Sequence, residues 1–217
     1  MVIKKINIKC FNNLERGYLI GLFVGDGYLY HDKWGHYKIN FYFNPNKDKD
    51  IAEITYFLLK KLGLSPYFMF NHGCLIVRSN SKQLFSYIQK EIPKIENQID
   101  KKFIIGFISG FIDSDGYVEK GDIVISNTKN HFLIIVQKFC KFLEINTNLW
   151  MQDVKYNGKI FKIWRLRIST RFKYEKHYSQ KIHRIYRGAL PIIASKYPRD
   201  ITYKGGVARR SRRAHNP

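Results

Sequence analysis

The segment LIGLFVGDG, residues 19–27, recurs as ISGFIDSDG at residues 108–116. One constant offset relates the two segments, and the same offset aligns Gly17 with Gly106. A self-match of this length at one register predicts that the chain contains two copies of one structural unit. Each copy is an apolar stretch rich in small residues that ends in an acid followed by glycine.

Small residues recur at every fourth position of both segments. They are Gly17, Gly21 and Gly25 in the first segment and Gly106, Gly110 and Ser114 in the second. Glycine inside a helix costs about 0.5–1 kcal/mol relative to alanine, so this spacing needs a physical reason. Close approach of two helix backbones is such a reason, as in helix pairs that meet through small residues. We therefore expect helices over residues 13–25 and 102–114 to pack together and to bring Asp26 and Asp115 to one point.

The rest of the pattern predicts an α+β fold made of two pseudo-symmetric αββαββα repeats. Alternating or helical hydrophobic periodicity indicates the other elements. In the first copy these are a strand over 37–43, a helix over 51–62, a hairpin of 66–70 with 75–78, and a helix over 81–91. In the second they are strands over 117–120 and 122–127, a helix over 130–144, a hairpin over 149–169 that turns at Asn157-Gly158, and helices near 174–187 and 190–196.

These elements predict how the chain divides. The first repeat is expected over residues 1–92, a linker over 93–101, the second repeat over 102–197, and a flexible basic tail over 198–217. Each repeat is expected to form a four-stranded antiparallel sheet with helices on one face. The other face is then free for a ligand, and the two sheets together would form a saddle.

The charge indicates what that ligand is. Lys and Arg together number 38 against 17 Asp and Glu, a formal net charge of +21. So large an excess is typical of a protein with a polyanionic partner such as nucleic acid. In the last strand, the apolar Leu166 and Ile168 alternate with Arg165 and Arg167, so that one side packs and the other carries guanidinium groups. The side chains predicted to contact DNA from the free faces are Lys38, Asn40, Tyr42, Arg78, Gln152, Arg165 and Arg167.

The cysteines and the hydropathy indicate the cellular compartment in which the protein is expected. Cys10, Cys74 and Cys140 are far apart and odd in number, and no C-x-x-C pair is present, which argues against structural zinc and a disulfide framework. An intracellular, reducing compartment (cytoplasmic or organellar) is therefore expected rather than secretion. No apolar run approaches the length of a membrane span, so a membrane role is not expected.

Both acid-ended helices resemble the motif that names the LAGLIDADG homing endonucleases, and the duplicated form resembles the monomeric two-motif members. The resemblance extends over about residues 13–195, because the order of strands and helices between the motifs also matches. It implies a DNA-binding saddle paired through the two motif helices, with Asp26 and Asp115 as ligands of divalent metal. Mg²⁺, or another divalent cation such as Mn²⁺, is the implied cofactor. The residues agree with this, because Mg²⁺ is usually held by one or two carboxylates together with phosphate oxygens and water.

Other site residues are less directly indicated. Asp113 also lies in the second motif, but its counterpart in the first is Val24, so a local cap or pair is expected for it rather than a metal ligand. The resemblance implies polar or basic side chains that order the attacking water. The candidates for this role are Asn44, Asn127 and Lys120, with Lys47 and Lys129 nearby.

The predicted function is that of a metal-dependent, site-specific endonuclease that cuts double-stranded DNA and is active as a monomer on a long asymmetric target. The alternative is an RNA-binding intron maturase, a splicing factor on the same scaffold whose partner would be intron RNA. A DNA-binding regulator without chemistry is a third interpretation. Retention of both Asp26 and Asp115 favours cleavage, since a protein that only binds needs neither acid.

Overall fold

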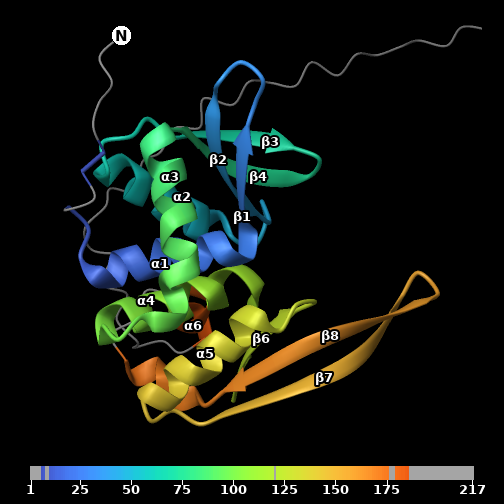
Figure 1. The fold of residues 1–217 in the computed structure, drawn as a ribbon. Coiled ribbons are helices and arrows are strands. Elements are labelled where there is room, and N and C mark those ends of the chain that lie inside the picture. The colour runs from blue at the N-terminus through green and yellow to red at the C-terminus, as the bar shows by residue number, and fades with distance from the viewer. Residues whose placement is uncertain (1–5, 8–9, 120, 176–178, 186–217) are drawn as a thin grey trace, which may run out of the picture.

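A computed structural model describes residues 6–7, 10–119, 121–175 and 179–185 of the 217-residue chain. The fold is α+β, with helices on one side and two separate sheets on the other (Figure 1). Two helices, α1 (Asn13–Asp26) and α4 (Lys101–Asp115), lie side by side in the middle of the molecule and join its two halves.

The first half follows the predicted αββαββα order. After α1 come β1 (Gly27–His31), β2 (Tyr37–Phe43), α2 (Lys49–Lys61), β3 (Tyr67–Asn71), β4 (Cys74–Asn80) and α3 (Lys82–Glu91). The four strands are antiparallel in the order β1-β2-β4-β3. The sequence pattern does not delimit β1, because its five residues GYLYH show no clean alternation of apolar and polar side chains.

The second half repeats the order. After α4 come β5 (Gly116–Glu119), β6 (Asp122–Asn127), α5 (His131–Phe142), β7 (Thr147–Tyr156), β8 (Lys159–Ile168) and α6 (Gln180–Ile185). The strand order is β5-β6-β8-β7, the equivalent of the first sheet. The predicted pair of αββαββα repeats is therefore confirmed.

The connections differ in detail from the prediction. Residues Ile92–Asn97, all but the first of which fall in the expected linker, form a 3-10 helix with Pro93 near its start. The helix expected near residues 174–187 is α6, preceded by a 3-10 helix over Thr170–Tyr174. The helix expected over 190–196 and the tail over 198–217 lie outside the described residues.

The two central helices meet through their backbones. A Cβ on Gly17 would stand 2.0 Å from the carbonyl oxygen of Phe103, and a Cβ on Gly110 would stand 2.1 Å from that of Tyr18. Successive glycines of α1 face successive turns of α4, so the helices run parallel and end at the same place. This is the physical reason for the small residues at every fourth position, and it directs both acids to one end of the pair.

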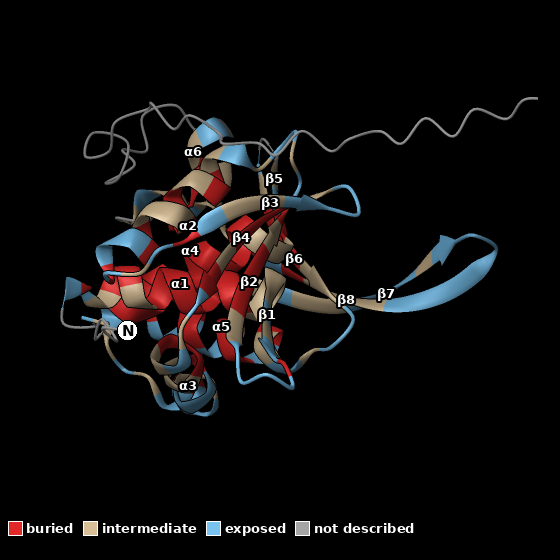
Figure 2. Cartoon of the chain, turned by 90° about the horizontal axis from the view of Figure 1, so that it is seen from above, coloured by how far each residue is buried: buried red, intermediate tan, exposed pale blue. Residues whose placement is uncertain are grey.

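The hydrophobic core lies between each sheet and its helices, and it is continuous through α1 and α4. In β2, Ile39, Phe41 and Phe43 are buried as the alternation predicts, and in β8 Leu166 and Ile168 are buried in the same way. Figure 2 shows the buried residues concentrated around the central helices, while the far end of the β7–β8 hairpin is exposed.

The β7–β8 hairpin projects away from the body of the molecule (Figure 1). It turns at Asn157 (φ +48°) and Gly158 (φ +76°), the two left-handed positions that an Asn-Gly hairpin turn requires. The predicted turn is thus confirmed. In the part of the chain that the structure describes, the helices are too short or too polar to cross a membrane.

Candidate metal centre and nucleic-acid interface

Asp26 and Asp115 are the last residues of α1 and α4, and the structure brings them together. A Cβ on Gly25, the neighbour of Asp26, would stand 3.3 Å from the carboxyl carbon of Asp115 and 2.0 Å from the hydroxyl oxygen of Ser114. Both aspartates are half-buried. The two carboxyl groups predicted to share a site therefore lie at the common end of the central helices.

The surroundings of the pair oppose its full ionisation. Burial, followed by the negative charge of Asp115, raises the pKa of Asp26 to about 7, and the charge of Lys181 acts in the opposite direction. Burial also raises the pKa of Asp115, although the hydrogen bond from Asn127 and the charge of Lys181 lower it. Two carboxylates confined to one poorly hydrated place repel each other, and a cation between them would remove that repulsion.

The donor set fits a hard divalent cation. Mg²⁺ takes oxygen ligands and is commonly held by one or two carboxylates, with the remaining positions filled by phosphate oxygens and water. Within the described residues there is no group of three or more His, Cys, Asp or Glu side chains that could hold a metal. A divalent cation held by Asp26 and Asp115 would therefore need further oxygens from a substrate or from solvent.

The two asparagine candidates occupy different environments. The amide of Asn127 donates to Oδ2 of Asp115 at 2.7 Å. The amide oxygen of Asn44 instead accepts the backbone N–H groups of Asn46 and Lys47, at 3.0 and 3.2 Å, and so forms the turn after β2.

The strand register explains this difference. Gly27 pairs with Phe41 and Gly116 pairs with Ile125, so that Asn127 corresponds to Phe43 of the first repeat. A one-residue difference in register places side chains on opposite faces of a sheet. The third candidate, Lys120, lies outside the described residues. Lys47 and Lys129 are exposed in the turns that follow β2 and β6.

The predicted interface residues of the first sheet form a connected polar row. Arg78 is the cross-strand partner of Asn40, and its Nε donates to the amide oxygen of Asn40 at 2.7 Å. The amide nitrogen of Asn40 lies 3.2 Å from the hydroxyl of Tyr42. Asn40 is only 3 % exposed, so it orients Arg78 rather than presenting its own amide to solvent. Lys38, on the same face, pairs with Asp32 at 3.0 Å.

The second sheet carries the remaining predicted contacts. Arg167 is exposed, pairs with Asp122 at 3.1 Å and lies over the ring of Trp150. Gln152 is exposed on β7, in the projecting hairpin.

Arg165 has a different setting from Arg167. It is the cross-strand partner of Ser126, which precedes Asn127, the residue that donates to Asp115. Its Nε is buried and has no hydrogen-bond partner among the described residues. A buried donor of this kind calls for an acceptor such as a phosphate oxygen or a water molecule.

Asp113 has a structural role, as predicted from its presence in only one of the two motifs. Most of its partners, however, are distant in the sequence. It is 1 % exposed and accepts four hydrogen bonds. The donors are the hydroxyl of Tyr18 at 2.8 Å, the hydroxyl of Ser179 at 2.7 Å, and the backbone N–H groups of Gln180 at 2.8 Å and Lys181 at 3.0 Å. Asp113 therefore caps α6, which follows it by more than 60 residues, and is not a local cap.

Lys181 is the site residue that sequence reasoning missed. Its ammonium donates to the carbonyl oxygen of Ser114 at 3.0 Å and to that of Gly116 at 2.7 Å, on either side of Asp115. In the sequence it is one of many basic residues in the last third of the chain, and no motif distinguishes it.

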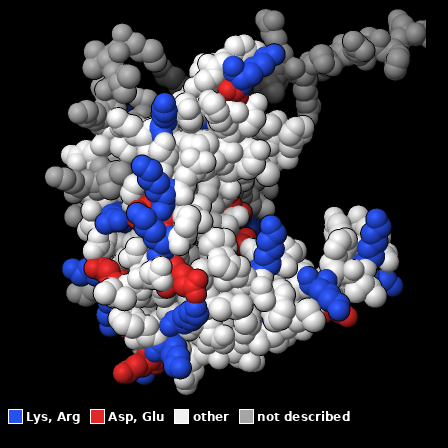
Figure 3. Space-filling view, viewed as in Figure 1, with Lys and Arg blue, Asp and Glu red and all other residues white. Residues whose placement is uncertain are grey.

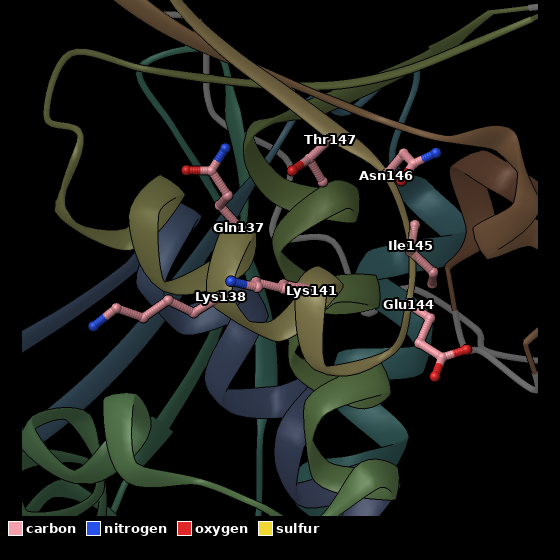
Figure 4. Close-up of a pocket in the computed structure, with 7 residues that line it drawn as sticks. All are labelled: Gln137, Lys138, Lys141, Glu144, Ile145, Asn146 and Thr147. Atoms are coloured by element: carbon pink, nitrogen blue, oxygen red, sulfur yellow. The ribbon is translucent and has the colours of Figure 1, made fainter.

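The surface agrees with a cleft for a polyanion. Figure 3 shows the molecule hollowed between the first sheet and the projecting hairpin, with Lys and Arg side chains on the hairpin and acidic atoms visible at the inner wall. A second depression, of about 510 Å³, opens at the end of α5 (Figure 4). Its lining residues, which include Lys138, Lys141 and Glu144, contain none of the candidate site residues.

The duplicated αββαββα fold, with an acid at the end of each of two parallel central helices, is the arrangement that the resemblance to two-motif LAGLIDADG proteins implies. Residues 102–180 match the family model described as a LAGLIDADG-like domain. The second repeat is therefore similar to a LAGLIDADG-like domain, and the fold of the chain is similar to that of the homing endonuclease I-DmoI.

Solved structures support the same architecture. A structure of mesophilic variants of the homing endonuclease I-DmoI matches with a TM-score of 0.60 and 23% identity, covering 74% of this chain and 92% of that one. I-DmoI in complex with DNA and Mn matches with a TM-score of 0.60 and 22% identity, covering 73% and 91%. Full-length DUF199/WhiA from Thermatoga maritima matches with a TM-score of 0.52 and 14% identity, covering 74% and 52%. At these identities the matches establish the fold.

A protein of Methanocaldococcus jannaschii named as uncharacterized is 26% identical over 148 residues. The match covers 65% of this chain and 53% of that protein, so the chain spans about half the length of the curated relative it matches.

Proposed function

We propose that the protein is a site-specific endonuclease that cuts both strands of double-stranded DNA and uses Mg²⁺ or Mn²⁺ held by Asp26 and Asp115. One observation carries this proposal: two parallel helices that touch through glycine backbones deliver their terminal carboxyl groups to one point beside two sheets. The structures of I-DmoI with target DNA and Mn, Ca or Mg support the substrate class and the kind of ion.

The residues around the pair have distinct roles in this proposal. A bound divalent ion supplies Lewis acidity to the phosphoryl oxygen and lowers the pKa of water. Asn127 fixes Oδ2 of Asp115 and leaves the other carboxylate oxygen for a ligand. Arg165 lies on β8 opposite Ser126, the residue before Asn127, and its guanidinium is assigned the role of donating to a phosphate oxygen and stabilising the charge that develops there.

The two sheets provide affinity and sequence preference. A net charge of +21 attracts phosphates, and neutralising about 6–10 phosphates would make binding fall by roughly 10³–10⁵ between low and moderate salt. Arg78, oriented by Asn40, has the fork that matches the acceptor edge of guanine in the major groove. Because both repeats are in one chain, a monomer suffices for a long target whose two halves differ.

A cleavage screen on a randomised duplex library tests the proposal. The wild-type protein should select and cut a defined sequence with Mg²⁺ or Mn²⁺ and should not cut with a chelator. The double variant Asp26→Asn, Asp115→Asn should keep DNA binding and lose cleavage. Glu144→Gln, which changes an exposed acid outside the site, is the matched control and should cut normally. Cleavage by the double variant at the wild-type rate would refute the site assignment.

The same variants address the maturase alternative. A maturase would assist the splicing of an intron-containing transcript, and that activity would persist in the double variant because RNA binding needs neither acid. Splicing assistance without duplex cleavage by the wild-type protein would replace the endonuclease proposal.

A further inference from the structure

A short strap over residues 179–184, which includes most of α6, ties the two repeats together beside the metal centre. On the second repeat it is anchored to Asp113 through Ser179 and the first backbone N–H groups of α6. On the first repeat Arg184 donates to Asp50 at 2.9 Å and lies 3.7 Å from Asp48, at the start of α2. Figure 2 shows α6 close to α2 and α4. The strap therefore has an anchor in each half of the molecule.

The strap places one cation at the end of α4. The ammonium of Lys181 bonds to the carbonyl oxygens of Ser114 and Gly116, and these two residues flank Asp115. Carbonyl groups in the last turn of a helix lack intrahelical partners, and a positive charge is favourable there. The contact closes the turn that carries Asp115 and holds a positive charge beside the carboxyl pair.

The first repeat has no acid at the position that corresponds to Asp113. The position of Asp113 is taken in α1 by Val24, which cannot cap a helix. The chain therefore supports the two acids unequally, although the helices that carry them are nearly equivalent.

We propose that Lys181 is a positioning residue of the metal centre, which holds Asp115 in place through its two flanking carbonyl groups and makes the two halves of the centre non-equivalent. This inference rests on the proposed function, in which the two aspartates are metal ligands. Outer-shell partners that orient a ligand commonly change metal affinity by about 10–100-fold when removed. The two acids belong to different repeats, so the loss should fall mainly on the DNA strand that is cut nearer to Asp115.

The test compares Lys181→Met, Lys181→Arg and wild type. Lys90→Met, which changes an exposed lysine of α3, is the control. Mn²⁺ binding is measured by electron paramagnetic resonance on the protein with and without DNA. Single-turnover cleavage is followed separately on each labelled strand of the duplex, and circular dichroism verifies folding. For Lys181→Met we expect Mn²⁺ affinity to fall about 10-fold or more. A duplex nicked always in the same strand should accumulate, and Lys181→Arg should restore most of both properties.

The outcomes separate this inference from the proposed function. Unchanged Mn²⁺ affinity in Lys181→Met, an equal loss on both strands, or no rescue by arginine would overturn the positioning role. If the wild type cuts no duplex but its Mn²⁺ affinity still depends on Lys181, the endonuclease proposal fails and the positioning role stands. If Lys181→Met does not fold, Ser179→Ala, which loosens the anchor on Asp113, should give the same strand bias, and equal cutting of both strands by it would count against the proposal.

Discussion

Gly17 of α1 lies against Phe103 of α4 so closely that a Cβ on Gly17 would stand 2.0 Å from the carbonyl oxygen of Phe103. The relationship is reciprocal, because a Cβ on Gly106 would stand 2.1 Å from the carbonyl oxygen of Leu14. These contacts set the register of the two helices. They therefore also determine that Asp26 and Asp115 meet.

Gly17→Ala should destabilise the protein, because the neighbour that must move is backbone. Overpacking of a core costs about 1–3 kcal/mol, and we expect the upper end of this range or more. Urea denaturation followed by circular dichroism measures the effect. Ser86→Ala, which adds no atoms within α3, is the control and should unfold at the wild-type urea concentration. An unchanged midpoint for Gly17→Ala would show that the helices can separate freely.

Asp26→Asn should make the metal-free protein more stable at pH 8 and leave it nearly unchanged at pH 4. The folded pKa of Asp26 is about 7, above its ordinary value of 3.8. The folded state therefore keeps a proton that the unfolded state loses, so the stability of wild type falls as pH rises from about 4 to about 7. The gain in the variant is at most about 4 kcal/mol, since a tenfold change in proton affinity corresponds to about 1.4 kcal/mol.

Urea denaturation at both pH values, with and without Mg²⁺, measures this difference. Added Mg²⁺ should stabilise wild type at pH 8 and have little effect on Asp26→Asn. Equal stabilities of the two proteins at pH 8 without metal would contradict the interpretation that burial and repulsion from Asp115 raise the pKa of Asp26.

Asn40→Ala should relax sequence preference without a general loss of DNA binding. The amide oxygen of Asn40 holds Nε of Arg78, so its removal leaves the guanidinium without a fixed orientation. A well-oriented bidentate contact discriminates between bases by about 1–3 kcal/mol. Binding to a library of single-base variants of the target should lose selectivity at one base pair, and the salt dependence should be unchanged. A uniform loss at all positions would instead indicate that the sheet is disrupted.

Arg165→Met and Arg167→Met should have different effects, although the two residues are neighbours in β8. Arg165 is half-buried opposite Ser126, and its buried Nε has no hydrogen-bond partner among the described residues, whereas Arg167 is exposed. We expect Arg165→Met to lower the single-turnover cleavage rate by about 100-fold with little change in affinity. Arg167→Met should weaken binding and reduce the slope of affinity against salt by about one. If the two variants changed the cleavage rate and the affinity in the same way, the two arginines would not have different roles.

Much of this fold follows from patterns within single elements. The duplicated segment predicts the helix pair, because backbone contact leaves no room for larger side chains at Gly17 and its equivalents. Alternation in β2 and β8 predicts which faces are buried, and Asn157-Gly158 predicts the turn of the long hairpin. Each of these depends on a local constraint that the residue types express directly.

The details of the site depend on relationships between distant residues and are less predictable. Asn44 and Asn127 both end strands in the sequence, yet the register makes Phe43 the counterpart of Asn127. Asn40 reads as an exposed strand residue, but the longer side chains beside it, Arg78 among them, bury it. Lys181 reaches the centre from α6, which Asp113 caps and which Arg184 ties to Asp50, and no periodicity encodes these contacts.

The long hairpin gives the molecule two unequal arms. β7 and β8 have 10 residues each, whereas β3 and β4 have 5 and 7. At about 3.3 Å per residue, one arm reaches about 10–15 Å farther than the other. Because the two hairpins differ in length, reversing the protein on a duplex would change how much DNA is contacted on each side of the cut. The protected footprint should therefore extend farther to one side of the cut, and the protein should bind its DNA in a single orientation.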